Sequence, residues 1–239
     1  MKARDRRPFS ELLEEGIRWP SQTATQVAGA RPPLPRMISR RHVRCEIPFE
    51  STKMPRVVRC ESKTERAFYS ELDGLRNVLW FQEQPLKVRY SFEGVRKTYC
   101  PDTLVALTTG RCFVAEVKEP IGVALFETIC KMNGLGSVAD DSGFGIFLGD
   151  HRSTVVDFLT QEEDVESKRA VLSACDRGGM RSEEWKSIYT RFGVRATSLN
   201  AIAFQERLVV TKTPFFVRRG RPDEERSIET FVERFKPRS

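Results

Sequence analysis

The sequence contains few histidines and no long apolar run. Only His42 and His151 occur among 239 residues. This scarcity argues against a Ser-His-Asp or Cys-His enzyme, which needs a base that titrates near neutral pH. No stretch approaches the about 20 consecutive apolar residues of a membrane helix, and the N-terminus MKARDRRPF has no apolar signal-peptide core. We therefore expect a cytoplasmic protein that does not associate with membranes.

Cysteine pairs are also missing. The six cysteines include no CxxC pair, and a chain of this length does not need a disulfide scaffold, so reduced thiols are expected. His42 and Cys45 lie close together in the sequence, but no second pair accompanies them, and they do not indicate a zinc site.

The net charge of +7 is concentrated in the N-terminal quarter. Residues 1–60 hold 13 Lys and Arg against 6 Asp and Glu, whereas the other 179 residues hold 27 of each. Each Lys or Arg placed against a phosphate releases counterions, so such an arm suits a polyanion. It suits a solvated tail equally well, and charge alone does not decide between the two.

The composition divides the chain into three segments. Residues 1–40 are predicted to form a basic arm or linker, with a short helix over 9–17 followed by small residues and prolines. Residues 41–150 are predicted to form an α/β core with a mixed sheet. Residues 151–239 are predicted to form a small helical, winged-helix-like module that could contact DNA or a protein.

The core elements follow from hydrophobic periodicity. The pattern predicts a helix over 62–75, an antiparallel meander of strands over 86–92, 95–100, 103–107 and 112–118, a helix over 124–139 and a strand over 144–149. LWFQEQP is expected as a short extended segment before the meander. In the last segment the pattern predicts helices over 152–174, 182–193 and 197–207, followed by a hairpin.

The informative motif is Pro101-Asp102 followed, after thirteen residues, by Glu116-Val117-Lys118. The two-residue period of a strand places Glu116 and Lys118 on one face and their neighbours toward the core. Two charges on an otherwise apolar strand are unfavourable unless they are paired or bound to a metal ion. Asp102 begins the preceding strand, so the turn between the strands lets the two carboxylates converge.

Converging carboxylates suit a hard divalent cation, Mg²⁺ with Mn²⁺ as a substitute, and the backbone carbonyl of Val117 could add a ligand. Such a cation polarises a phosphoryl group and lowers the pKa of a bound water. Lys118 would orient that water or neutralise charge on the phosphate. Glu65, on the buried stripe of the helix over 62–75, would complete the acidic cluster, and Gln84 would orient the attacking water. The set predicts metal-dependent phosphodiester cleavage.

Each of these residues also has a structural interpretation. Ser62 and Glu65 match an S-x-x-E capping box, but we favour the metal role because Glu65 begins the stripe that faces the sheet. A Pro-Asp pair more often marks a turn. Glu116 and Lys118 alone could be a solvated pair on an edge strand, and Gln84 alone is more often a loop residue. The elements become specific only in their combined order.

Four runs of the sequence resemble the TnsA endonucleases, the end-cleaving subunits of heteromeric bacterial transposases: FESTKMPRVVRCESKTERAFYSELDG, FQEQPLKVRY, YCPDTLVAL and VAEVKEP. The resemblance covers about residues 40–150, continues more loosely in NAIAFQERLVV and the hairpin after it, and does not extend to residues 1–40. It implies a restriction-endonuclease-like PD-(D/E)xK core, and it matches Glu65, Asp102, Glu116 and Lys118 to the catalytic motif positions.

This resemblance implies a metal-dependent DNA endonuclease that cuts the 5′, non-transferred strands at transposon ends in double-stranded DNA. A DDE-type recombinase, TnsB, cuts and joins the 3′ ends, and an AAA+ ATPase, TnsC, contacts the C-terminal part of TnsA, here residues 151–239. Two alternatives stay open: a stand-alone restriction or repair nuclease of the same class, and a DNA-binding or assembly subunit that kept the fold without catalysis. The complete set of four motif residues argues against the last.

Overall fold

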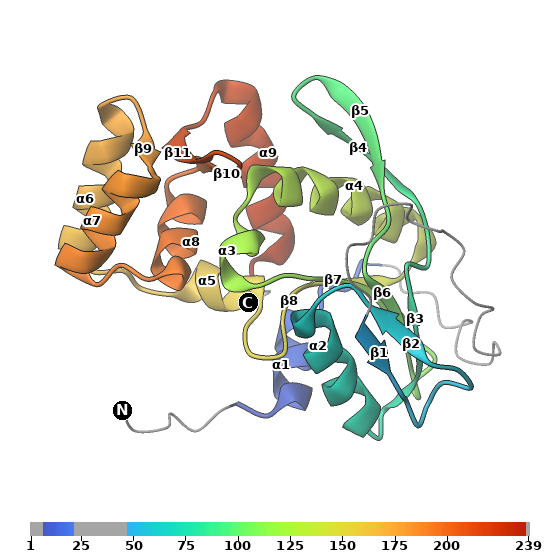
Figure 1. Ribbon diagram of the computed structural model, residues 1–239. Helices are drawn as coiled ribbons and strands as arrows, with labels where there is room; N and C mark the ends of the chain where they lie inside the picture. The colour runs from blue at the N-terminus through green and yellow to red at the C-terminus, as the bar shows by residue number, and fades with distance from the viewer. Residues whose placement is uncertain (1–6, 22–46, 238–239) are drawn as a thin grey trace. The chain divides into compact units, whose positions relative to one another are not determined.

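The computed structural model describes residues 7–21 and 47–237 (Figure 1). The chain divides into two compact units, Met1–Glu119 with Gly134–Thr154 and Pro120–Asn133 with Val155–Ser239. These units differ from the segments predicted with boundaries at residues 40 and 150. His42, Cys45 and much of the predicted arm lie outside the described residues.

Unit 1 is built on a mixed four-stranded sheet of order β3-β6-β7-β8. The strands β3 (Val78–Glu83), β6 (Thr103–Leu107) and β7 (Cys112–Val117) are antiparallel neighbours, and β8 (Gly145–Gly149) runs parallel to β7. Helix α1 (Phe9–Gly16) contacts β8, while α2 (Lys63–Gly74) contacts β7 and the short pair β1 (Ile47–Phe49) and β2 (Val58–Cys60). The predicted α/β class with a mixed sheet is therefore confirmed.

The core of unit 1 lies between this sheet and its helices. Phe68 and Leu72 of α2 are fully buried, as the apolar stripe over 62–75 predicts. Phe9, Leu12 and Leu13 of α1 join the same cluster. The helix expected inside a loose N-terminal arm is thus part of the globular unit, because its apolar face packs into the core instead of facing solvent.

The predicted meander is wrong in one respect. The strands β4 (Val88–Phe92) and β5 (Val95–Tyr99) form a separate two-stranded sheet, and the neighbour of β6 is β3, which comes from the LWFQEQP segment. Prolines stand at both ends of the β4–β5 hairpin, at Pro85 and Pro101. Because proline has no backbone N–H to donate to a ladder, it detaches the hairpin from the main sheet.

Unit 2 is mainly helical. Its helices are α3 (Pro120–Val123), the first part of α4 (Phe126–Ser142), α5 (Val155–Thr160), α6 (Val165–Asp176), α7 (Ser182–Phe192), α8 (Ala196–Gln205) and α9 (Pro222–Phe235). Its antiparallel sheet, of order β10-β11-β9, consists of β9 (Met180–Arg181), β10 (Leu208–Lys212) and β11 (Phe215–Arg219). The two predicted helices and the hairpin after them are present.

Two features of unit 2 differ from the prediction. The helix expected over 152–174 is two helices, because the Asp164 side chain accepts a hydrogen bond from the Ser167 N–H at 2.8 Å and caps the start of α6. α9 was not predicted at all, although Pro222 stands at the start of its first turn.

Helices α7 and α8 form a helix-turn-helix. Gly193 ends α7 in the left-handed region with φ of 68°, and α8 begins three residues later. Residues 199–204 of α8 are all buried, and α8 contacts α3, α5 and β10. The second helix of this motif is therefore an interior helix of unit 2.

Five cysteines fall within the described chain, and all five are buried and free of disulfide bonds. Over the same residues, no helix combines the length and the apolar character needed to cross a bilayer.

Candidate active site

The predicted residues Asp102, Glu116 and Lys118 lie together in unit 1. Asp102 directly precedes β6, and Glu116 is near the end of the neighbouring strand β7. The register pairs Thr103 with Ala115, which places Asp102 beside Glu116 across the ladder. Lys118 follows β7, and its N–H donates to the carbonyl of Gly149 on the other side, at 2.8 Å. The site thus stands where two central strands meet.

The Lys118 ammonium is the point on which these groups converge. Its Nζ lies 2.8 Å from Glu116 Oε1, 3.2 Å from Asp102 Oδ2 and 3.1 Å from the carbonyl oxygen of Val117. The same Asp102 oxygen accepts a hydrogen bond from the Val117 N–H at 2.7 Å. The side chains of Glu116 and Asp102 are only 3% and 11% exposed, so burial strengthens their attraction to the ammonium.

Lys118 stays charged in this setting. Burial by itself lowers the pKa of Lys118, but the carboxylates of Asp102 and Glu116 oppose this and raise the pKa above its ordinary value. A lysine with a raised pKa is a poor general base. Its chemical capacity is that of a fixed positive charge and hydrogen-bond donor, which suits a phosphate or a developing negative charge.

Glu65 reaches the same neighbourhood from the start of α2. Its Oε2 accepts a hydrogen bond from the Glu61 N–H at 2.8 Å, its Oε1 lies 3.2 Å from the Ser62 hydroxyl, and its own N–H donates to that hydroxyl at 3.0 Å. Ser62 therefore caps α2 as the pattern indicates, but the Glu65 carboxylate accepts from the Glu61 N–H and not from the Ser62 N–H, so the reciprocal half of the capping box is not formed. Burial and the Asp102 carboxylate nevertheless raise the pKa of Glu65 to about 7, while Lys118 opposes the rise. Its carboxyl group lies within the electric field of the site.

Gln84 is held in the site by both its backbone and its side chain. Its N–H donates to the carbonyl of Asp102 at 2.9 Å, and its Nε2 donates to Glu61 Oε1 at 2.5 Å. It is 4% exposed and has φ of 48°, a conformation that non-glycine residues adopt mainly where the surroundings enforce it. The prediction placed Gln84 correctly near the acids, and its role with water stays a prediction.

Glu61 is the residue that the sequence analysis missed. It links Gln84 to Glu65, since its carboxylate accepts from Gln84 and its N–H donates to Glu65. Its position in the Cys-Glu-Ser run before the helix was a usable signal, because a residue just before an N-cap lies beside the first turn.

Two tyrosines stand behind the acids. The Tyr69 hydroxyl donates to the carbonyl oxygen of Asp102 at 3.1 Å, and Tyr69 is fully buried. Burial raises the pKa of Tyr69, with smaller contributions from Glu65 and Asp102, and burial followed by Glu116 raises that of Tyr99. Both rings therefore stay neutral. Tyr69 lies four residues after Glu65 on α2, a spacing that could have identified it from sequence.

The donor set fits a hard cation in part. Two carboxylates and a carbonyl surround the Lys118 ammonium, and oxygen ligands of this kind are those that Mg²⁺ prefers. Within residues 7–21 and 47–237, however, no group of three or more His, Cys, Asp or Glu side chains is placed to hold a metal ion. Glu65 therefore does not form a three-carboxylate metal site with Asp102 and Glu116.

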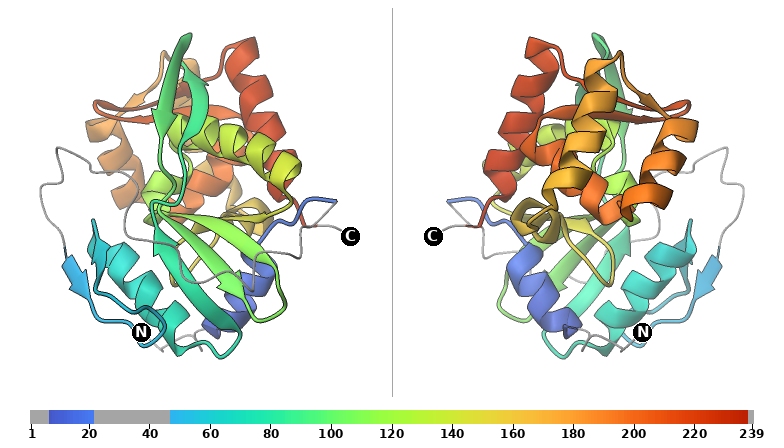
Figure 2. Two further views of the ribbon diagram at one scale, coloured as in Figure 1. Left: turned by 90° about the vertical axis from the view of Figure 1, so that its right-hand side faces the viewer. Right: turned by 90° about the vertical axis from the view of Figure 1, so that its left-hand side faces the viewer.

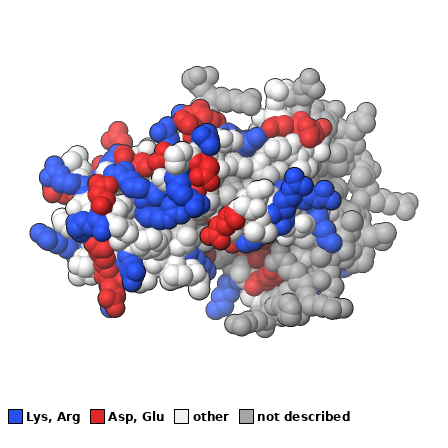
Figure 3. All heavy atoms as spheres, turned by 90° about the horizontal axis from the view of Figure 1, so that it is seen from above, with Lys and Arg blue, Asp and Glu red and all other residues white. Residues whose placement is uncertain are grey.

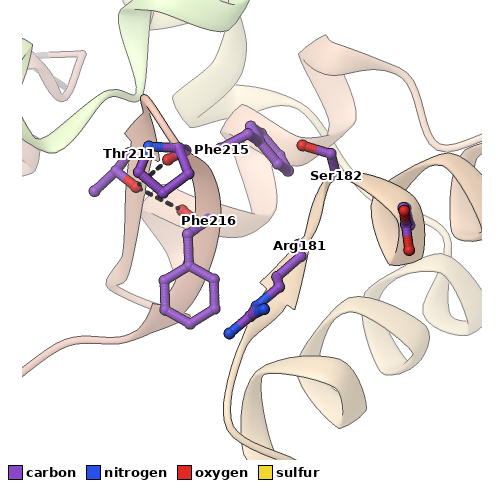
Figure 4. A pocket seen from close by; sticks show the side chains of 7 residues that line it. Arg181, Ser182, Thr211, Phe215 and Phe216 are labelled. Carbon is purple, nitrogen blue, oxygen red and sulfur yellow. Dashed lines mark hydrogen bonds between the residues drawn. The ribbon is translucent and has the colours of Figure 1, made fainter.

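A groove in unit 2 offers no comparable chemistry. It has a volume of about 580 Å³ and is lined mainly by apolar atoms, with Phe215 and Phe216 on one side and Arg181 facing them (Figure 4). The hydroxyl of Thr211 donates to the carbonyl of Pro214 at 2.9 Å. No carboxylate pair lines this groove, so it does not compete with the site in unit 1.

The chain matches no protein-family model and no curated protein sequence. Its class follows from the fold alone: it is an α/β protein with a mixed sheet, in which two buried carboxylates and a lysine meet at adjacent strands.

The pH dependence of stability provides a test of the environment of Glu65. Its pKa is about 7 in the folded protein against 4.5 for the ordinary group. The folded state therefore holds a proton that the unfolded chain releases between these values. Stability falls as pH rises through this window, by up to about 3 kcal/mol.

Glu65→Gln imitates the protonated form. In buffer with EDTA we expect it to match wild type near pH 4 and to exceed it by about 3 kcal/mol near pH 8, by urea denaturation. The substitution Glu50→Gln, at an exposed residue of the same unit, serves as the control. Parallel pH curves for wild type and Glu65→Gln would show that Glu65 is not electrostatically strained.

Proposed function

We propose that this chain is a divalent-cation-dependent DNA endonuclease and acts as the TnsA-like subunit of a multi-subunit transposase, cutting the 5′, non-transferred strands at transposon ends. The observation that carries the nuclease part is the convergence of Asp102, Glu116 and the Val117 carbonyl on Lys118. The transposase part is supported by the sequence resemblance over residues 40–150.

In this proposal Asp102, Glu116 and the carbonyl of Val117 would hold Mg²⁺, with Mn²⁺ as a substitute. When bound, the cation supplies Lewis-acid activation of the phosphodiester. Lys118, which stays charged, contacts a non-bridging phosphate oxygen and stabilises the negative charge that develops there. A bound cation and the Lys118 ammonium would compete for the same oxygens of Asp102 and Glu116.

The connected residues Glu61, Glu65 and Gln84 would position the attacking water and take up its proton. Gln84 is fixed by Glu61 and by the Asp102 backbone, so its amide can orient a water by hydrogen bonding. Glu65, with a pKa of about 7, is poised to accept and release a proton near neutral pH. In this proposal Gln84 orients the water and Glu65 exchanges its proton.

The partners of the proposed complex are a DDE-type, TnsB-like transposase and an AAA+, TnsC-like ATPase, the latter contacting residues 151–239. A donor plasmid with transposon ends, both partners and Mg²⁺ should yield 5′-strand cuts with wild type. Asp102→Asn should lower this cleavage by on the order of 100-fold or more, since removing one charge impairs both the cation and the Lys118 contacts.

The same experiment separates the alternatives. Cleavage of plain plasmid by the purified chain with Mg²⁺ or Mn²⁺ would instead identify a stand-alone nuclease. Assembly with both partners that proceeds equally with Asp102→Asn, and without any 5′ cut, would identify an idle structural subunit. Equal cleavage by wild type and Asp102→Asn would remove this site from the reaction.

A further inference from the structure

The β4–β5 hairpin carries a row of exposed cations on one face. Arg89 stands opposite Thr98, and Ser91 stands opposite Arg96, in the antiparallel register. All four are exposed, and Lys87 extends the row two residues earlier on the same side. In the described chain, Lys87, Arg89 and Arg96 make no ion pair or hydrogen bond through their side chains. This outward face is defined here as Lys87, Arg89, Ser91, Arg96 and Thr98.

Several surface cations elsewhere in the chain are paired with carboxylates. Figure 3 shows one face of the molecule, on which Lys and Arg side chains form several groups interspersed with Asp and Glu. Arg169, Arg177 and Arg207, for example, each pair with a glutamate. The outward face of the hairpin has no acidic side chain among its members, and its charges repel one another until an external anion neutralises them.

The opposite face of the hairpin fixes its orientation. Val88, Tyr90 and Tyr99 are buried, and the two tyrosine rings meet edge to face with centroids 5.5 Å apart. The backbone lies so close to Gly134 that a Cβ there would come within 2.6 Å of the Arg89 carbonyl oxygen. The cations are therefore displayed by a packed ribbon and not by a free loop.

Both ends of the hairpin begin at the candidate active site. Gln84, which binds Glu61, precedes β4 by four residues, and Tyr99 precedes Asp102 by three. Figures 1 and 2 show the hairpin rising as a separate ribbon from the ends of β3 and β6. A phosphate bound at Asp102 would therefore lie next to the base of this hairpin.

We propose that the outward face binds the sugar-phosphate backbone of duplex DNA beside the cleaved bond; this inference rests on the proposed function. Cations two residues apart on a strand are separated by about 7 Å, and each DNA strand presents a phosphate every ~3.4 Å along the axis. The row can thus contact several phosphates along one strand, with the hydroxyls of Ser91 and Thr98 as further donors. Such contacts position the duplex without reading its sequence.

The test compares full-length wild type with the triple variant Lys87→Gln/Arg89→Gln/Arg96→Gln. The probe is a fluorescent 30-base-pair duplex without transposon sequence, and the readout is anisotropy from 50 to 200 mM salt in EDTA. Loss of three phosphate contacts should weaken binding by on the order of tenfold or more at low salt. It should also reduce the slope of log K against log salt by about 2 to 3.

A charge-matched control carries Arg76→Gln/Arg195→Gln/Arg226→Gln, three exposed arginines from other elements, and should change affinity much less. Benzoylphenylalanine in place of Ser91 should cross-link to the duplex, whereas the same residue in place of Thr230 on α9 should not. Equal affinity of the two triple variants, or no duplex binding by wild type at 50 mM salt, would overturn the inference.

Asp102→Asn separates this inference from the proposed function. It should fail to cut, whereas its duplex binding in EDTA should still depend on Lys87, Arg89 and Arg96 as in wild type. If the hairpin variant loses duplex binding but wild type does not cut DNA, the inference stands and the proposed nuclease function is rejected. If the hairpin variant binds normally and Asp102→Asn loses the cleavage seen with wild type, the nuclease function stands and the inference is rejected.

Discussion

Lys118→Ala is expected to lower DNA cleavage by on the order of 100-fold or more and to destabilise the metal-free protein by about 3 kcal/mol. The ammonium lies 2.8 Å from Glu116 and 3.2 Å from Asp102. Removing it leaves two buried carboxylates close together without a compensating cation, which is much less favourable than a neutral site. Cleavage of a transposon-end plasmid with the partner proteins and urea denaturation in EDTA would measure the two effects.

A magnesium titration distinguishes a catalytic site from a merely structural ion pair. The oxygens of Asp102, Glu116 and Val117 surround the ammonium, so a divalent cation can replace it in Lys118→Ala. We expect millimolar Mg²⁺ to restore much of the stability of this variant, with a smaller effect on wild type, because a ligand stabilises the state that binds it.

The control for Lys118→Ala is Lys63→Ala, an exposed residue at the start of α2. It should change stability by less than about 0.5 kcal/mol and show no special response to Mg²⁺. If Lys118→Ala were as stable as wild type in EDTA and indifferent to Mg²⁺, the three oxygens would not form a cation site. Retained cleavage would separately remove Lys118 from the reaction.

The part of the site that could be predicted from sequence is the part set by local geometry. Glu116 and Lys118 share a face because of strand period, and Asp102 joins them through a single tight connection between neighbouring strands. Glu65 belongs to a local pattern too, but the same pattern encodes a helix cap: Ser62 caps α2, and the Glu65 carboxylate binds the N–H of Glu61 just before it. Local rules could not tell these two uses apart.

The contacts of Gln84 depend on distant pairing. Its side chain meets Glu61, which is 23 residues away, and its place beside Asp102 follows from the pairing of β3 with β6. The periodicity of LWFQEQP is too short to identify a sheet partner, and the hairpin between β3 and β6 looked like a more natural neighbour. Non-local strand order is the information that a single sequence carries least directly.

Unit 2 shows the opposite case, in which signals were present but unused. The segment of α9 has Pro222 at its first position, three acids in its first turn, and Ile228, Phe231 and Phe235 buried on one face. In α8, the run of apolar residues around Asn200 predicts a helix buried on all sides. By contrast, α7 is mostly exposed, whereas Leu208, Val209 and Val210 of β10 are buried like α8.

Arg56→Met is expected to destabilise unit 1 by about 3 kcal/mol. The two guanidinium nitrogens of Arg56 donate to both carboxylate oxygens of Glu83 at 2.5 and 2.6 Å, and the Glu83 side chain is only 3% exposed. The hydrogen bonds to Glu83 raise the pKa of Arg56 above its ordinary value. Without the guanidinium, Glu83 is a buried charge that has lost its bidentate partner. A buried ion pair with one member removed is strongly unfavourable.

The double variant Arg56→Met/Glu83→Leu should recover most of the lost stability, because replacing both members of a buried pair by apolar groups of similar size is often close to neutral. Urea denaturation of wild type, both single variants and the double variant gives the coupling energy, and the exposed Arg76→Met serves as control. Equal stabilities of Arg56→Met and the double variant would contradict a buried, coupled pair. Glu83 directly precedes Gln84, whose N–H holds the Asp102 carbonyl. Arg56→Met should therefore also lower cleavage. The double variant should recover cleavage only if the position of Gln84 depends on packing around residue 83 and not on the charge of Glu83.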